Sequence, residues 1–194
     1  MEAFWLYFKL GFSHVLDWNA YDHILYLTAL VAAYSFNSWK RVFWLASIFT
    51  LGHMLSLALA AFGVVQVNIK IVEFLIPVSI IIAGLYNIFT AGKPIASQKV
   101  NLLYFITLFF GLVHGFGFST YFKMISESAA NKSLLLLEFA LGIEVAQLLV
   151  VLVVLILAFI FQNLFKFAKR DWILIISSLI IGITLPILRD NWPW

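Results

Sequence analysis

The chain carries four histidines, and all of them lie inside or at the edge of long apolar stretches: His14, His23, His53 and His114. An ionisable side chain at the centre of a bilayer costs about 2.5–3.5 kcal/mol even on the mildest scales. Such side chains therefore need partners, which can be one another, a polar cavity or a bound cation. Because imidazole nitrogens bind divalent transition metals, the four histidines are candidate metal ligands.

Acidic and amide side chains accompany these histidines. Asp22 directly precedes His23, and on a helix the two side chains point about 100° apart. One of them can then bind a cation while the other orients a ligand from behind. Glu144 is a further candidate ligand, and Gln147, three residues later, shares its helix face. Three more residues are expected to support the site, namely Glu73, Asn87 and Glu138.

Glycines surround the histidine in the fourth long apolar stretch. Gly111 and Gly115 form a small-xxx-small pattern, and Gly117 follows two residues later. Small residues at this spacing let two membrane helices approach closely. We therefore expect the glycines to serve helix packing, which does not explain an imidazole at membrane depth beside them.

Several of these residues also have a plain structural interpretation. Asp22 near a helix start favours the helix dipole, and His14 can lie at the membrane interface. The serines and threonines that flank His53 can hold helices together through hydrogen bonds. The pattern alone leaves the structural and the functional interpretations open.

The composition indicates a membrane protein. Hydrophobic residues make up 64% of the 194 residues and charged residues 11%, against about 45–50% and 25% in soluble domains. The chain has no cysteine, which excludes disulfides and thiolate metal ligands. A net charge of +3, spread over loops, favours membrane orientation over nucleic-acid binding.

The hydrophobic runs predict an all-α, polytopic membrane protein with six spanning helices in a single domain, residues 1–194. We place these helices at residues 21–36, 42–65, 71–91, 100–122, 134–161 and 172–188. Residues 1–18 hold an apolar run too short to span, which predicts an interfacial or re-entrant helix.

The basic residues predict the orientation of these helices. Seven of them fall on one side of the predicted topology, including Lys40, Lys99 and Arg170, and five fall on the other. The positive-inside rule places the richer side in the cytoplasm and both termini outside. Most of the ionisable groups then belong to the outer half of the bundle.

Five segments in one order resemble the HupE/UreJ family of small bacterial membrane proteins, in particular its second branch. They cover residues 11–150: Gly11-Phe-Ser-His14 with Asp22-His23; Phe49-Thr-Leu-Gly-His53; Val72-Glu73 through Asn87; Phe110-Gly-Leu-Val-His-Gly-Phe-Gly-Phe118; and Gly142-Ile-Glu144-Val-Ala-Gln147. The resemblance implies a permease for nickel or cobalt in the bacterial inner membrane. It implies that His14, Asp22, His23 and His114 occupy the positions of the family's characteristic residues.

The leading hypothesis is a permease or binding protein for a divalent transition metal (nickel, cobalt or zinc), with the lipid bilayer as its surroundings and the metal ion as its substrate. His23, His53, His114 and Glu144 would form most of the site, while Asp22, Glu73 and His14 would guide entry. An intramembrane zinc-dependent hydrolase acting near the outer leaflet is the alternative. A polar network that only specifies helix packing, or an accessory subunit, is the third possibility.

Overall fold

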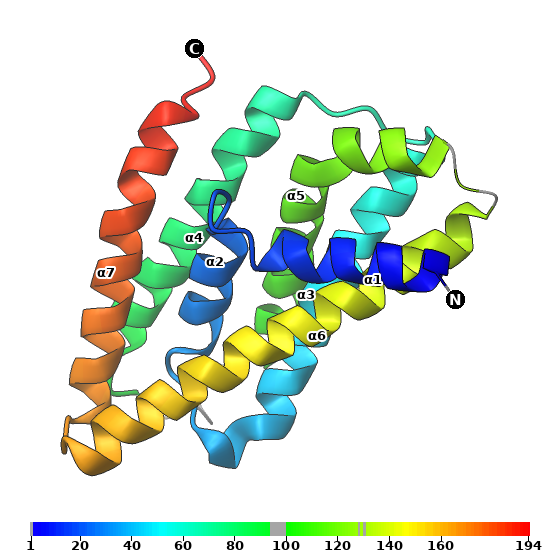
Figure 1. Cartoon of the computed structure of the whole chain (residues 1–194). Helices are drawn as coiled ribbons and strands as arrows, with labels where there is room; N and C mark the ends of the chain where they lie inside the picture. The colour runs from blue at the N-terminus through cyan, green and yellow to red at the C-terminus, as the bar shows by residue number, and fades with distance from the viewer. Residues whose placement is uncertain (1, 94–99, 128, 130) are drawn as a thin grey trace.

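Every regular element in residues 2–93, 100–127, 129 and 131–194, which the computed structural model describes, is helical (Figure 1). The helices are α1 (Glu2–Val15), α2 (Asp22–Val31), α3 (Trp39–Ala61), α4 (Ile69–Thr90), α5 (Val100–Glu127), α6 (Lys132–Phe159) and α7 (Lys169–Asp190). A 3₁₀ turn, η1 (Phe36–Ser38), precedes α3, and a π-helical turn, η3 (Ile160–Leu164), follows α6.

Five helices, α3 to α7, are long and apolar enough to cross a membrane. They correspond to five of the six predicted spans, and the largest shift is in α5, which continues to Glu127 instead of ending at residue 122. The remaining predicted span, residues 21–36, contains the ten-residue helix α2. At about 1.5 Å per residue α2 is roughly 15 Å long, half of a hydrocarbon core of about 30 Å. The all-helical membrane fold is confirmed, and a count of six spans is not.

Helix α1 crosses the first half of α6 at very short range (Figure 1). A Cβ added to Gly11 would lie 2.2 Å from the carbonyl oxygen of Phe139, and one added to Gly142 would lie 2.1 Å from that of Phe8. Only glycine on both helices lets the two backbones meet in this way. The crossing carries the end of α1, and His14 with it, into the bundle. Whether α1 is interfacial or re-entrant stays a prediction.

Helices α3 and α5 pack through a second group of glycines. A Cβ on Gly52 would lie 2.3 Å from the carbonyl oxygen of Leu108, and one on Gly111 would lie 2.4 Å from that of Phe49. One turn further along α5, a Cβ on Gly115 would meet the carbonyl oxygen of His53 at 2.3 Å. Gly117 faces α4 instead, where its Cβ would meet the Ile76 side chain at 2.7 Å.

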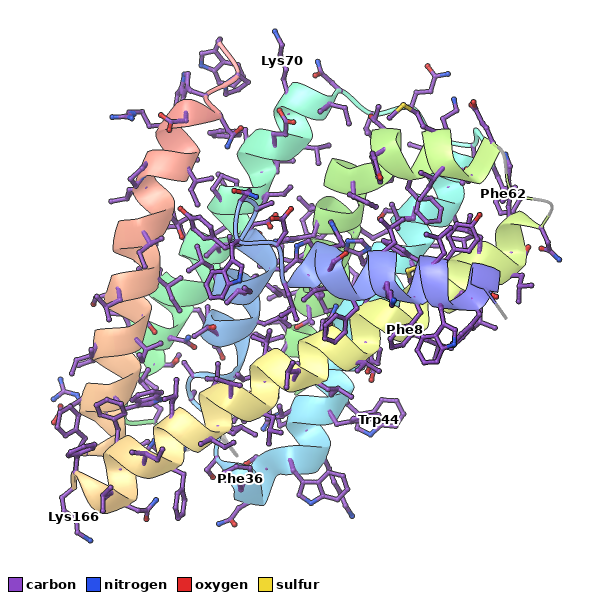
Figure 2. The ribbon with its side chains drawn as sticks, viewed as in Figure 1. Phe8, Phe36, Trp44, Phe62, Lys70 and Lys166 are labelled. Carbon is purple, nitrogen blue, oxygen red and sulfur yellow. The ribbon has the colours of Figure 1, made fainter. Side chains whose placement is uncertain are left out.

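Contacts made by α7 and by the residues that follow it hold two opposite ends of the bundle. At one end the Trp172 indole nitrogen donates a hydrogen bond of 3.1 Å to the carbonyl oxygen of Ala32. At the other end Phe74 and Trp192 place their ring centroids 5.3 Å apart. Lys70 and Lys166 mark the two ends (Figure 2). The end with Lys166 also holds the basic residues of the predicted cytoplasmic side, except Lys99, which lies outside the described residues.

We expect Gly111→Ala to lower the free energy of unfolding by about 1–3 kcal/mol, because the added methyl group must displace the backbone of α3. Thermal unfolding in detergent measures this loss. Gly182→Ala is the matched control, since a Cβ there has no atom within 4 Å. Alanine in that helix is expected to stabilise by up to about 1 kcal/mol. Equal effects at the two positions would contradict the close packing of α3 and α5.

Candidate metal site

The four histidines come from four helices and meet in one group. His14 lies in the last turn of α1, His23 in the first turn of α2, His53 inside α3 and His114 inside α5. The ring centroid of His23 lies 4.6 Å from that of His14, 5.3 Å from that of His53 and 5.3 Å from that of His114. His23 is therefore the centre of the group.

Three of these rings offer one nitrogen each to a shared point. The ligand atoms of His14, His23 and His53 all lie within 4.8 Å of one another. The Nε2 atoms of His14 and His53 are 3.3 Å apart. Two neighbouring nitrogens that each bind one metal ion at about 2.1 Å lie about 3.0–3.4 Å apart. The same separation suits a hydrogen bond between the rings, so a proton and a metal ion are alternatives at this pair.

Hydrogen bonds at the Nδ1 atoms of His23 and His114 orient these rings and their Nε2 atoms. The Nδ1 atom of His114 lies 2.8 Å from the carbonyl oxygen of Phe110, which can only accept, so Nδ1 carries the proton. The Nδ1 atom of His23 lies 3.2 Å from Oδ1 of Asp22, the carboxylate partner often found behind a metal-binding imidazole. Each Nε2 atom then presents a lone pair.

Three buried nitrogens in this group have no hydrogen-bond partner: Nε2 of His23, Nδ1 of His53 and Nε2 of His114. These three residues are at most 2% exposed. A buried polar atom without a partner costs about 1–3 kcal/mol. Imidazole lone pairs gathered beside a carboxylate fit a cation.

Aromatic rings enclose the histidines. Phe118 packs on His14 with 4.0 Å between centroids, and Phe118 in turn stacks on Phe139. On the opposite side the rings of Tyr26 and Phe49 each lie 5.1 Å from that of His114. These walls help to shield the rings of His23, His53 and His114 from water. None of the four rings was a candidate from the sequence, because an aromatic residue in an apolar run is usually part of the core.

The predicted ligand Glu144 lies in a separate polar network between α6 and α3. Its Oε1 atom accepts a hydrogen bond of 2.6 Å from the Ser47 hydroxyl, and its Oε2 atom accepts one from the Thr50 hydroxyl. The Thr50 Oγ1 atom is also 3.1 Å from Oε1 of Gln147. The structure thus links Glu144 and Gln147 through Thr50, and among the described residues no hydrogen bond joins them to the imidazoles.

The three supporting residues lie elsewhere. Glu73 is exposed near the start of α4. Asn87 is buried and donates a hydrogen bond of 2.7 Å from Nδ2 to the carbonyl oxygen of Ala29, which ties α4 to α2. Glu138 is 8% exposed and precedes Phe139, whose ring centroid lies 6.0 Å from that of His14. The described contacts therefore place Asp22 as the carboxylate beside the histidines.

Fold and site together define a multi-pass helical membrane protein built around four imidazoles, three of them buried, and one partly exposed carboxylate. The chain belongs to the HupE/UreJ family, whose model, described as HupE / UreJ protein, matches residues 1–188. No curated protein and no solved structure matches the chain.

We expect Thr50→Val to lower the free energy of unfolding by about 1–2 kcal/mol, because valine keeps the shape and removes a donor from the partly buried Glu144 carboxylate. Thermal unfolding in detergent is the measurement. Thr184→Val is the matched control, because that buried hydroxyl bonds only within its own helix, to the carbonyl oxygen of Ile180. A loss at Thr184 as large as that at Thr50 would mean that the bond between α3 and α6 contributes no specific stability.

Proposed function

We propose that this protein binds a divalent transition-metal ion at His14, His23, His53 and His114 and carries it across the membrane. The observation that supports this most is the convergence of ring nitrogens from three helices within 4.8 Å. Imidazole nitrogen suits nickel, cobalt and zinc. Family membership adds support, because the resemblance of the motifs implies nickel or cobalt transport.

The charge of the site fits a cation that must later leave. With neutral imidazoles the group carries one negative charge, on Asp22, and a divalent ion reverses the sign. Protonated imidazole has no lone pair for a metal, so protons compete with the ion. Metal binding is therefore expected to weaken as pH falls, which gives the ion a release route that needs no large rearrangement.

The protein would be a multi-pass protein of the bacterial cytoplasmic membrane, with its more basic end in the cytoplasm. Transport is favoured over the intramembrane hydrolase by the placement of the acids. A zinc hydrolase needs a carboxylate free to act as a general base beside the metal-bound water. Asp22 is held by His23, and Glu144 is held by Ser47 and Thr50.

The test is binding and flux in the same protein. Calorimetric titration of the purified chain with Ni²⁺, Co²⁺ and Zn²⁺ is expected to give one site. We expect His53→Ala to weaken that site at least about tenfold, since even a residue behind a ligand contributes about 10–100-fold. Liposome uptake of the same ions is expected to fall in parallel. Glu73→Gln, at an exposed carboxylate, is the control and is expected to retain both activities.

Three outcomes would count against this proposal. If the wild-type chain binds none of the three ions, the imidazole group serves helix packing alone. Binding without uptake would make the chain a metal-binding protein instead of a carrier. If His53→Ala and Glu73→Gln had equal effects, the ion would bind elsewhere.

Asp22 provides a separate prediction about how the site is oriented. Asp22→Asn keeps a hydrogen-bond acceptor for Nδ1 of His23 but removes the negative charge. We expect metal affinity to fall about 10–100-fold, with thermal stability nearly unchanged. Calorimetry and thermal unfolding on the same sample separate these effects. Asp171→Asn, at an exposed acid on α7, is the charge-matched control. An unchanged affinity in Asp22→Asn would remove Asp22 from the site.

A further inference from the structure

A cavity of about 340 Å³ lies between α2, α4 and α5, next to the imidazole site. This volume is within the range of about 300–1,000 Å³ that small-molecule sites have. Its inner wall contains Tyr26 and Phe110, whose exposed fractions are 1% and 8%. Most of the remaining lining is aliphatic, including Ala29, Ala83 and Ile106. The interior therefore suits a hydrocarbon chain better than an ion.

The cavity opens on the outer surface of the bundle. Ile82, Tyr86 and Leu102 line it, and their side chains are 47%, 41% and 54% exposed. All three belong to helices that are long and apolar enough to span. In a bilayer these exposed positions face acyl chains, so the cavity is reached sideways from lipid.

The end of the cavity near the carboxyl end of α4 is polar and cationic. Lys93 and Thr90 line it there. Arg170 packs beside the adjacent turn, where its Cδ atom would lie 3.5 Å from a Cβ on Gly92. The Arg41 guanidinium lies 5.6 Å from the ring centroid of Tyr34, another lining residue. Three cations from three parts of the chain therefore surround one end of the cavity.

Among the described residues, one acidic residue lies at this end of the bundle. It is Asp171, which is exposed in the first turn of α7. In the part of the chain that the structure describes, neither Lys93 nor Arg170 takes part in an ion pair. An apolar lining that ends near the Lys93 and Arg170 cations is complementary to a molecule with a long apolar tail and an anionic head.

We propose that this cavity is a binding site for an anionic phospholipid, with one acyl chain between α2, α4 and α5 and the phosphate near Lys93. Basic pockets between membrane helices on the cytoplasmic side are the usual sites of anionic headgroups. The site is distinct from the imidazole group but shares Tyr26 with it, since that ring lines the cavity and lies 5.1 Å from the ring of His114. It does not depend on the proposed metal transport.

The experiment compares an anionic and a zwitterionic lipid with the same acyl chains. The full chain in detergent is titrated with phosphatidylglycerol or phosphatidylcholine of the same acyl chains, and retained lipid is counted by native mass spectrometry. We expect phosphatidylglycerol to bind more tightly. Lys93→Gln is expected to weaken it about fivefold, as one basic residue near a headgroup contributes. Lys70→Gln, at an exposed lysine of the opposite end, is the matched control and should change nothing.

A second variant tests the acyl chain. Ala83→Trp fills part of the cavity without changing a charge and is expected to reduce retained phosphatidylglycerol. If Ala83→Trp fails to fold, Lys93→Gln still decides the headgroup. Equal binding of the two lipids, or equal effects of Lys93→Gln and Lys70→Gln, would overturn the proposal. Full lipid retention in a folded Ala83→Trp protein would place the lipid outside the cavity and would overturn it as well.

The absence of cysteine allows one further check. In vesicles, Ala33→Cys inside the cavity is expected to resist a charged, water-soluble thiol reagent that modifies the control Asn163→Cys, at an exposed residue of the same end of the bundle. Equal rates at the two cysteines would mean that the cavity holds water instead of lipid.

Discussion

The structure depends on the requirement that four imidazoles and one carboxylate satisfy one another inside an apolar bundle. A polar atom that is left without a partner in such surroundings costs about as much as a hydrogen bond contributes, and a lone charge costs more. Because His23, His53 and His114 are nearly inaccessible, bulk water cannot provide hydrogen-bond partners for their ring nitrogens. The Asp22 carboxylate and the Phe110 carbonyl oxygen satisfy two ring nitrogens. The remaining nitrogens are left for each other or for a cation.

The glycine contacts follow from this requirement. Imidazoles on different helices reach one point only if the helix backbones come close, and a Cβ at Gly11, Gly142 or Gly115 would prevent that approach. The aromatic rings then fill the space around the group. The close helix backbones, the enclosing aromatic rings and the unpaired nitrogens therefore belong to one arrangement. In it, close helix packing brings the imidazoles together.

The sequence identified the histidines, because an imidazole in an apolar run has few uses other than a polar site. It also made Glu144 a candidate ligand, without information on how α6 is rotated relative to its neighbours. On α6, Glu144 points about 200° from Gly142, the residue that contacts α1. It therefore faces Ser47 and Thr50, away from His14. That direction depends on which face of α6 receives α1, and composition carries no such information.

The short helix α2 has a similar explanation. Residues 21–36 are apolar enough to resemble a span, but α1 already lies across α6, and the chain turns into α2 beside the imidazole group. Two helix ends thus meet at the histidines: the last turn of α1 brings His14, and the first turn of α2 brings Asp22 and His23. A discontinuous helix pair of this kind is tolerated at membrane depth where it lines a protein-enclosed site.

These helix ends also influence the charge preference of the site. The carboxyl end of α1 carries a partial negative charge of about half an elementary charge, which favours a cation beside His14. The amino end of α2 has the opposite sign, and Asp22 in its first turn offsets that. With a continuous spanning helix neither end would be present at this depth. The break between α1 and α2 therefore brings His14 and His23 together from two directions and adds a local field that attracts positive charge. It explains why these two imidazoles lie at helix ends.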